Sequence, residues 1–529
     1  MRHFVRLRQD NSGIGYGLRR PRWRNPILCI YGNALIMLLP LVALTIMLGR
    51  PSATVVDWYN AIGPGYLMVV TAYAAYRVAR TLPAALWSPA FWLLASSAVF
   101  FGFGPLVAVF GNEGTQVRLS VGNLAISEVE LFQSNRLSLI GVFALILGFW
   151  LHARIRRAEW LAALTGSQNR KQVAFNPETL TVAFVVGGMI LVHVIIMPSQ
   201  WGQLDIVVPG ALTSIASIVN VGFAIAASLA VRGSKRMVWL LVLLWPLHLL
   251  LTVLSFAKSA LMIALLLPAI GAYLGHRRMV RLAVAALVIG GVYTLSQDFV
   301  HYGRSEIMQG TGTIWQAGYG ERMRITRDYF TGGPDTAASF RTLDEEQGWW
   351  LRLNYSAVQA MAIRFRDQGV VIDTLSNVWT MFIPRILWPG KPIYVGPGAQ
   401  FYTLITGNRG TNVGVSLFGD VYWQFGWLGI MTIIPLIGWM FAMLSWRSIE
   451  TVLQLNLIRM PLVLLSILMP AQGLTMWLAN GIIAVIPIYI AYLLLIILVE
   501  RFVRSQRRRR AGAPSGFPPM SKTRPGPSV

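Results

Sequence analysis

The sequence has a single cysteine, Cys29, and few charged residues, which make up 12% of its 529 positions. One cysteine excludes an internal disulfide and a cysteine-rich metal or iron–sulfur site. The six histidines have no ligand spacing such as His-Glu-x-x-His, and no paired acidic motif stands in an early loop. The phosphate-binding pattern Gly-x-x-x-x-Gly-Lys-Ser/Thr is also missing, which argues against an ATP-driven pump. We therefore expect no metal ion and no cofactor.

Acidic residues are scarce as well, with 21 Asp and Glu against 45 Lys and Arg, for a net charge of +24. In a soluble chain this balance would suggest nucleic acid as a partner. Here 55% of the residues are apolar and the mean hydropathy is +0.57, which is typical of an integral membrane protein. The basic residues then serve membrane topology and contact with anionic lipid, and we expect no nucleic-acid partner.

Long apolar stretches are abundant, and most approach the roughly 20 residues that a helical span requires. They predict an all-α integral membrane protein of about 12 transmembrane helices, because a spanning backbone must satisfy its own hydrogen bonds. The stretches lie near residues 27–48, 60–77, 85–110, 137–152, 179–198, 210–231, 238–256, 259–275, 280–296, 427–446, 460–478 and 482–500.

The positive-inside rule gives the orientation. With the N-terminus in the cytoplasm, the segments on that side hold 30 of the 45 Lys and Arg residues. We therefore expect both termini in the cytoplasm and one large external loop. The predicted organisation is a basic N-terminus (1–26), transmembrane helices 1–9 (27–296), a large periplasmic loop (297–426), helices 10–12 (427–500) and a basic disordered tail (501–529).

The large loop far exceeds the usual connection between helices, so it should have structure and function of its own. Apolar residues recur in it at helical spacing and predict an amphipathic helix near the membrane surface, with Arg352, Gln359, Arg364 and Arg366 at its other positions. The apolar set is Leu351, Tyr355, Val358, Ala362 and Phe365. Residues 372–382 suggest a second short helix, stopped by Pro384.

Within this loop, residues 377–392 place Arg385 and Lys391 among tryptophan, phenylalanine and proline. An arginine binds phosphate bidentately and keeps its charge when partly desolvated, so the segment is a candidate site for a phosphorylated lipid-linked sugar. A membrane-surface anchor is the alternative, since tryptophan with flanking basic residues also lies at headgroup level in many membrane proteins.

Two motifs of the loop resemble those of a known family. They are Ile383-Pro-Arg-Ile-Leu-Trp-Pro-Gly-Lys-Pro392 and Ser416-Leu-Phe-Gly-Asp-Val-Tyr-Trp-Gln-Phe-Gly-Trp-Leu-Gly429. With the plan of many helices and one late periplasmic loop, they resemble the bacterial oligosaccharide repeat-unit polymerases (O-antigen or Wzy-type polymerases). The likeness covers mainly residues 296–446.

The resemblance implies a glycosyltransferase of the bacterial inner membrane, active in polysaccharide biosynthesis of lipopolysaccharide or exopolysaccharide. It would transfer the growing glycan from undecaprenyl pyrophosphate to the next lipid-linked repeat unit on the periplasmic face. Its expected partners are undecaprenyl pyrophosphate-linked oligosaccharide, membrane lipids and, as a further candidate, a chain-length regulator protein.

Such a transfer needs cations for the leaving pyrophosphate and a base for the acceptor hydroxyl. His301 is the first candidate for the base, because its unperturbed pKa lies near working pH and Arg304 follows three residues later. His193 and His248, inside predicted helices, are ranked as core residues. The other catalytic candidates are Asp298, Glu306 and Asp420. The candidate pyrophosphate ligands are Arg385, Lys391, Lys258, Arg304, Arg409 and Arg322. The candidate sugar or lipid contacts are Trp388, Trp379, Tyr422 and Trp423.

Two other readings stay open. A secondary transporter or lipid flippase often has twelve helices with both termini inside, although the halves here show no evident repeat. An O-antigen ligase uses a similar loop but transfers the finished glycan to a lipid core.

Overall fold

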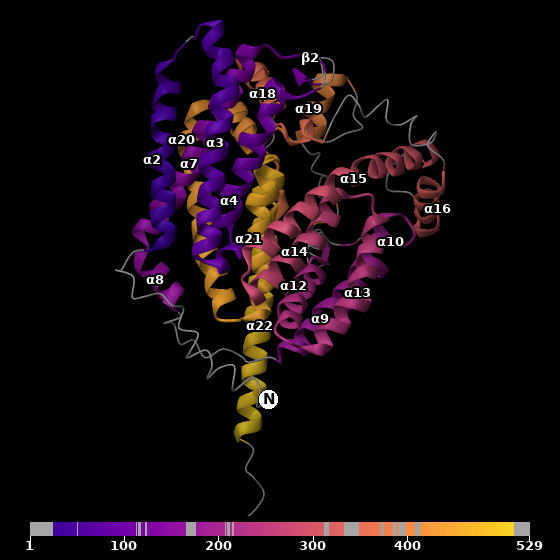
Figure 1. Ribbon diagram of the computed structural model, residues 1–529. Helices are drawn as coiled ribbons and strands as arrows, with labels where there is room; N and C mark the ends of the chain where they lie inside the picture. Colours follow the sequence, from indigo (N-terminus) through magenta and orange to yellow (C-terminus); the bar gives the residue numbers. More distant parts are fainter. Residues whose placement is uncertain are drawn as a thin grey trace, which may run out of the picture.

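The protein, seen in a computed structural model, is an almost entirely helical membrane protein (Figure 1). Nine of its described helices are long and apolar enough to cross a membrane, which confirms the predicted class. Two further apolar helices are shorter, and α3 (Ala53–Thr81) has the length but is less apolar. The structure describes residues 25–49, 51–112, 114, 118–121, 124–165, 176–206, 208, 212–213, 216–311, 317–332, 349–370, 372, 375–383, 388, 390, 397–407 and 413–512.

The helices form two groups that lie side by side in Figure 1. The first group contains α2 (Pro26–Met47), α3, α4 (Pro89–Ser97), α7 (Glu128–Ile155), α8 (Arg157–Thr165), α20 (Leu417–Leu453), α21 (Met460–Gly473) and α22 (Val485–Gly512). The second contains α9 (Pro177–Met189), α10 (Met197–Gln200), α12 (Ile218–Val231), α13 (Lys235–Val253), α14 (Lys258–His276), α15 (Met279–Thr311) and α16 (Tyr319–Thr331). Wider π turns at Ala98–Phe103 and Ile190–Ile196 interrupt otherwise continuous helices, and a third, Ala479–Ile483, begins the last span.

Glycine allows α7 and α20 to pack with their backbones in contact. A Cβ atom added at Gly148 would lie 1.9 Å from the Pro435 carbonyl oxygen, and one added at Gly438 would lie 2.1 Å from the Leu145 carbonyl oxygen. Small residues at such contacts let membrane helices approach closely, where dispersion forces then hold them together. A third glycine acts at the start of α20, which belongs to the second motif of the sequence: a Cβ atom added at Gly141 of α7 would lie 2.5 Å from the Phe418 ring.

One end of the bundle carries the short elements of the loops. They are a hairpin of β1 (Ser120–Val121) and β2 (Leu124–Ala125), the 3₁₀ turns Leu351–Leu353 and Val378–Phe382, α18 (Ser356–Asp367) and α19 (Pro397–Thr406). In Figure 1 the β2, α18 and α19 labels lie at the upper end, whereas α8 and the last turns of α22 lie at the lower end.

The predicted amphipathic helix exists as α18, but it packs against α7 and α20 instead of lying free on a membrane surface. Gln359, placed by the sequence among the polar positions, is fully buried. Among the described residues of the second predicted helix, 372 and 375–382, the helical part is the 3₁₀ turn Val378–Phe382.

Two helices extend beyond their predicted ends. α15 continues to Thr311, so His301 and Arg304 lie on a helix and not in a loop as predicted. The extension is amphipathic: Phe299 and Val300 are buried against an apolar cluster, and polar residues cover its other face. α20 begins at Leu417, where the Ser416 side chain accepts a hydrogen bond from Gly419 N. The predicted start at 427 coincides with a kink at Gly426, whose φ of 61° requires glycine.

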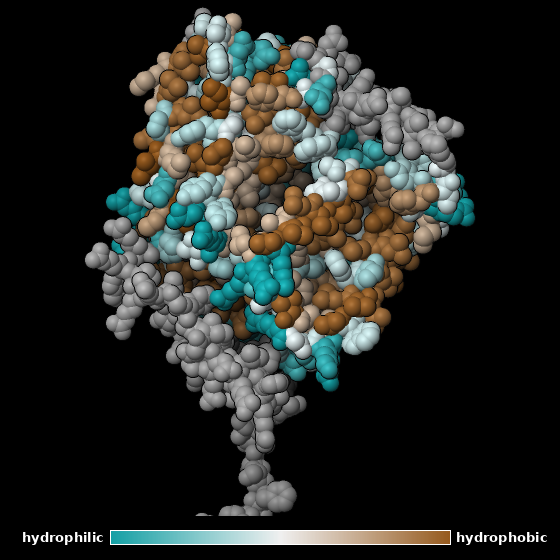
Figure 2. Space-filling view, in the orientation of Figure 1, coloured by the Kyte–Doolittle hydropathy of each residue, from teal (hydrophilic) through white to brown (hydrophobic). Residues whose placement is uncertain are grey.

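The outer surface of the helices is apolar, as a membrane requires. Figure 2 shows brown side chains over much of the face occupied by α13, α14 and α15. Large apolar side chains such as Leu243 on α13 and Leu287 on α15 are exposed. They would lie against lipid.

Candidate functional site

The turn between α13 and α14 is the point where the three described candidate cations meet. It is built around Phe256, which is buried and has a φ of 48°, in the left-handed region that a bulky residue rarely adopts. The ring of Phe256 packs on α15 at Gly303, where a Cβ atom would lie 2.3 Å from the ring carbon Cε1. Strained residues that their surroundings hold in place often mark functional sites.

Lys258, Arg304 and Arg322 all contact this turn or the helices that form it. The Arg304 Nε atom donates to the Phe256 carbonyl oxygen at 3.0 Å, and an Nη atom of Arg322 donates to the Leu254 carbonyl oxygen at 3.2 Å. Lys258 opens α14 and donates to Gln297 of α15. The structure therefore brings together three cations that the sequence suggested separately.

His301 lies on the same face of α15 as two of these contacts. Gln297, His301 and Arg304 are four and three residues apart, and residues with these spacings are neighbours on a helix surface. Because Gln297 and Arg304 both face the α13–α14 turn, His301 lies over it too. We call Lys258, His301, Arg304 and Arg322 the turn cluster.

Arg322 differs from the others because its side chain is buried, with 1% of its surface exposed. Its Nε atom donates to the Ala317 carbonyl oxygen at 2.7 Å, and its guanidinium lies 4.1 Å from the centre of the Trp201 ring. Burial lowers the pKa of Arg322 to about 10, so it stays protonated at neutral pH. Arg322 therefore holds the turn and contributes positive potential from inside, while Lys258 is partly exposed and Arg304 exposed.

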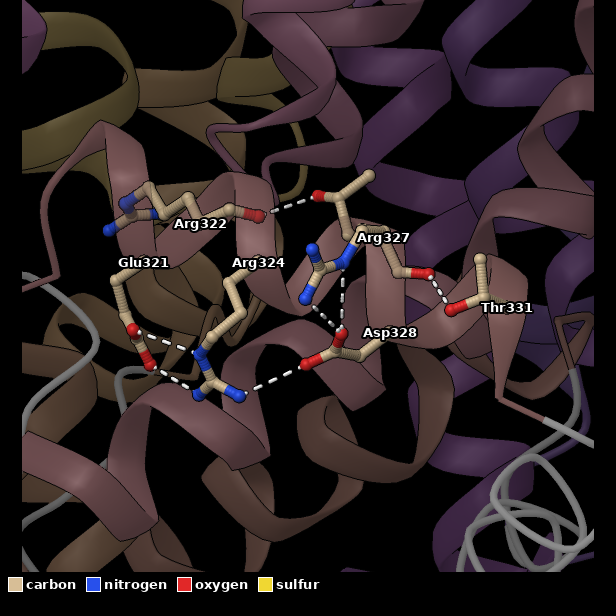
Figure 3. Close-up of polar contacts among 7 residues, drawn as sticks. Glu321, Arg322, Arg324, Arg327, Asp328 and Thr331 are labelled. Carbon is tan, nitrogen blue, oxygen red and sulfur yellow. Dashed lines mark hydrogen bonds and ion pairs between the residues drawn. The ribbon is translucent and has the colours of Figure 1, made fainter.

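The acidic residues of α16 lie on another side of the helix from Arg322. Figure 3 shows Arg324 between Glu321 and Asp328, with Arg322 pointing away from them. Arg324 forms ion pairs with Glu321 at 2.6 Å and Asp328 at 3.0 Å. The hydrogen bonds described above for the turn cluster go instead to carbonyl oxygens and an amide. Neutral acceptors leave the positive charge of their donors in place, which suits an anion site.

A fourth cation and an aromatic stack lie beside the turn cluster. Arg352, on the 3₁₀ turn before α18, is close enough to Arg304 to interact with its charge. Next to it, the ring of Trp350 stacks on Phe103 with centroids 4.9 Å apart, and its Nε1 atom donates to the Phe103 carbonyl oxygen at 2.9 Å. Trp349 stacks on the same ring at 6.1 Å and is 42% exposed. Arg352 was expected only at a polar position of the amphipathic helix, and Trp349 and Trp350 were not predicted as site residues. Their adjacency in the sequence is the signal that marks them.

The remaining acidic candidates lie outside this face of α15. Asp298 is exposed. Glu306 interacts electrostatically with Arg324 and so faces α16. Asp420 is fully buried at the start of α20, where its carboxylate accepts from Leu478 N at 2.8 Å and from the Gln424 side chain. These hydrogen bonds give Asp420 a role in joining α20 to the segment after α21.

Tyr422 and Trp423 belong to a different region from the turn cluster. Trp423 is buried in the apolar cluster under α18, and its Nε1 atom donates to the Val370 carbonyl oxygen at 2.7 Å. Tyr422 is half-buried beside Trp427 and the guanidinium of Arg366. In this structure Trp423 stabilises the fold and offers no surface to a ligand.

The first motif lies mostly outside the described residues. Its Arg385 and Lys391 lie outside them, as does Arg409 further along the loop. Trp379 and Trp388 are described: their rings stack with centroids 5.9 Å apart, and Trp379 is 55% exposed. A stacked tryptophan pair with one exposed ring is a surface on which a sugar or a lipid can lie.

A buried polar network lies under α18 and was not predicted from the sequence. Asn135 Nδ2 donates to Asn60 Oδ1 at 3.1 Å, Ser356 Oγ donates to Asn135 Oδ1 at 2.8 Å, and Ser138 Oγ donates to Gln359 Oε1 at 3.0 Å. Polar residues inside apolar helices indicate such a network in a sequence, because burying them without hydrogen-bond partners is costly. His193 and His248, ranked as core residues, do pair with each other, at 2.9 Å.

The turn cluster and the apolar helices together define a polytopic helical membrane protein with a cationic group next to a histidine. Among the described residues, no group of three or more His, Cys, Asp or Glu side chains could hold a metal ion. Comparisons with models of protein families, with curated proteins and with solved structures find no match.

Proposed function

We propose that this protein polymerises lipid-linked oligosaccharide repeat units, transferring the growing glycan from undecaprenyl pyrophosphate to the next lipid-linked unit. The observation that carries the proposal is the turn cluster, where Arg304, Lys258 and the buried Arg322 surround the α13–α14 turn, with His301 beside Arg304 on α15. The chemistry requires this combination, because a pyrophosphate must leave and a hydroxyl must lose its proton.

In the proposed reaction, the acceptor hydroxyl oxygen attacks the anomeric carbon of the donor glycan. His301 takes the proton of that hydroxyl. The bond between the anomeric carbon and the pyrophosphate oxygen breaks, and its electron pair stays on the pyrophosphate. Arg304 and Lys258 stabilise the charge that develops there, and Arg322 adds positive potential while holding the turn in place.

The proposed topology has twelve spans, with the nine long apolar helices supplemented by α3, α12 and α21. The ends that carry most Lys and Arg would face the cytoplasm of a bacterial inner membrane, with both termini there. Because α16 and α18 lie toward the other end of the bundle in Figure 1, the turn cluster would then face the periplasm. A chain-length regulator would be a partner on that side.

The test is glycan analysis of a deletion strain complemented with the wild type, Arg304→Gln, His301→Gln or Arg385→Ala. We expect single repeat units without polymer in the deletion strain and in the Arg304 and His301 variants. Arg327→Gln is the matched control, because Arg327 is an exposed arginine on α16 whose described ion pair is with a neighbouring aspartate. Protein levels in the membrane are measured for every strain.

The other outcomes separate the competing functions. Full-length polymer accumulating on its lipid carrier in the deletion strain would identify an O-antigen ligase. Normal polymer in the deletion strain would overturn the polymerase proposal and favour a transporter or lipid flippase. The third outcome is normal polymer in the Arg304 and His301 variants, at normal protein levels, but none in the deletion strain. It would keep the polymerase proposal and move the active site to Arg385 and the neighbouring part of the large loop.

A further inference from the structure

A cavity of about 310 Å³ lies between α20, α21 and α22, at the end of the bundle opposite α18. One part of its lining is charged: Arg447, Glu450, Arg459 and Glu500. Another part is apolar: Leu462, Val463, Leu493 and Ile497. The spans of α20 and α22 end close by, at Leu453 and Val503, so in a membrane the cavity would lie at headgroup level.

Two of the four charges neutralise each other. The guanidinium of Arg459 donates to both carboxylate oxygens of Glu500, at 3.1 and 3.2 Å. In a bidentate pair of this kind, two parallel hydrogen bonds fix the relative orientation of the two side chains. It fixes α22 against the start of α21 and leaves Arg447 and Glu450 as the charges that a ligand would meet.

Arg447 and Glu450 have opposite charges, and neither forms an ion pair within the part of the chain that the structure describes. Arg447 is exposed, and its guanidinium lies 5.6 Å from the centre of the Trp446 ring. Glu450 is 8% exposed, and one of its oxygens accepts from the Gln454 amide at 3.0 Å. The described hydrogen-bond partner of this buried carboxylate is neutral, and burying a carboxylate without a cationic partner is costly.

We propose that this cavity binds the phosphoethanolamine headgroup of a membrane phospholipid. The phosphate would lie against the guanidinium of Arg447, and the primary ammonium would donate to the carboxylate of Glu450. The two residues are three apart on α20, which places their Cβ atoms about 5–6 Å from each other, a separation suited to a short zwitterion. The acyl chains would leave along the apolar side of the lining.

The geometry favours a primary ammonium over a quaternary one. A primary ammonium donates three hydrogen bonds, whereas the trimethylammonium of a choline headgroup donates none. Glu450 therefore supplies the selectivity, and Arg447 supplies affinity for any phosphate. This site is independent of the proposed polymerase function, since it lies at the other end of the bundle.

The experiment is native mass spectrometry of the full-length protein with titrated phosphatidylethanolamine, phosphatidylcholine or phosphatidylglycerol. We expect binding of phosphatidylethanolamine to be about tenfold tighter than that of phosphatidylcholine, the value of one charged hydrogen bond. Glu450→Gln should remove this preference, and Arg447→Gln should weaken binding of all three lipids.

Each variant has a matched control. Arg154→Gln removes an arginine that also lies over a tryptophan ring, at 5.0 Å from Trp150, but does not line the cavity. Glu159→Gln removes a carboxylate of α8 that is paired with Arg156 and does not line the cavity. Both should retain the wild-type preference for phosphatidylethanolamine.

Two further arms use only the wild-type protein, so they stand even if Glu450→Gln fails to fold. Successive N-methylation of phosphatidylethanolamine should weaken binding stepwise as N–H donors are lost. Soluble glycerophosphoethanolamine should compete at least tenfold less well than the lipid, because it lacks the apolar part. Equal binding of phosphatidylethanolamine and phosphatidylcholine, or of the lipid and its soluble headgroup, would overturn the proposal.

Discussion

The packing of Phe256 against Gly303 can be tested by adding one methyl group. In Gly303→Ala the new Cβ atom would lie 2.3 Å from Cε1 of the Phe256 ring, far inside normal contact distance. Phe256 is buried and its main chain is already in the left-handed region, so the ring cannot simply swing away. The α13–α14 turn must shift relative to α15, and Arg304 must lose or lengthen its hydrogen bond to the Phe256 carbonyl oxygen.

Two terms of opposite sign set the size of this effect. Replacing glycine by alanine within a helix stabilises it by about 0.5–1 kcal/mol. Overpacking a filled core costs about 1–3 kcal/mol. Gly290→Ala, on the same helix α15, has only the first term, because nothing lies within 4 Å of its Cβ position. The difference between the two variants therefore isolates the overpacking cost, and we expect Gly303→Ala to be less stable than Gly290→Ala by about 1–3 kcal/mol.

The assay is unfolding of the purified protein in mixed micelles with increasing dodecyl sulfate, followed by tryptophan fluorescence. Gly290→Ala should unfold at or slightly above the wild-type midpoint, and Gly303→Ala below it. Glycan polymer should also fall in the Gly303 variant if the turn cluster is the active site. Equal midpoints for the two alanine variants would refute the close packing of Phe256 on α15 and the arrangement of the turn cluster built on it.

Other variants test further contacts. Arg322→Met should lower the free energy of unfolding by about 2 kcal/mol or more, because it leaves two buried carbonyl oxygens without their donor; chemical denaturation measures this. Asp420→Ala should lower the free energy of unfolding by about 1–3 kcal/mol, because it leaves the buried N–H of Leu478 without an acceptor. Asp420→Asn keeps an acceptor and should be more stable. An Asp420→Ala variant that is stable but makes no polymer would instead indicate a catalytic role. Gly426→Ala should lower the melting temperature, because a φ of 61° costs alanine about 1–2 kcal/mol. Hydrogen bonds from Arg324 lower the pKa of Glu321. The contribution of Glu321 to the free energy of unfolding is therefore fully present above pH 4.5 and is lost as the pH falls through the lower pKa of the folded state. Glu321→Gln should flatten that part of the profile of stability against pH, measured by denaturation at several pH values.

Hydropathy predicted where the helices lie because a span must be continuously apolar, and all twelve predicted stretches overlap helical segments. Hydropathy did not predict the ends of helices that continue beyond the apolar stretch. The last four turns of α15 alternate buried Phe299 and Val300 with polar side chains, and such a stretch has low average hydropathy while still being a good amphipathic helix. The start of α20 was predicted too late for a similar reason, since its apolar run begins only after the kink at Gly426.

The sequence also suggested the charged residues of the site but not their partners. Lys258, Arg304 and Arg322 are separated by up to 64 positions in the chain, and only the fold of α13–α16 shows that they surround one turn. Burial was harder still to predict. Gln359 looked like a surface residue of an amphipathic helix, but its carbonyl oxygen accepts from serines of α7 inside the bundle. A polar residue on a helix that caps a bundle can be satisfied by the bundle itself, which no pattern within the helix reveals.

Placing His301 on a helix changes what the proposed mechanism requires of it. A histidine in a loop could approach a substrate by a change of backbone conformation. On α15 its position relative to Arg304 is fixed by the helix, about 5–6 Å between Cβ atoms for residues three apart. The base and the pyrophosphate ligand are then preorganised, and the acceptor must enter between them. Arg304→Lys should consequently restore little activity, because a lysine in that position loses the planar fork that bonds the Phe256 carbonyl oxygen and a phosphate at once. Polymer analysis of Arg304→Lys beside Arg304→Gln measures this, and full activity of the lysine variant would show that a simple positive charge suffices.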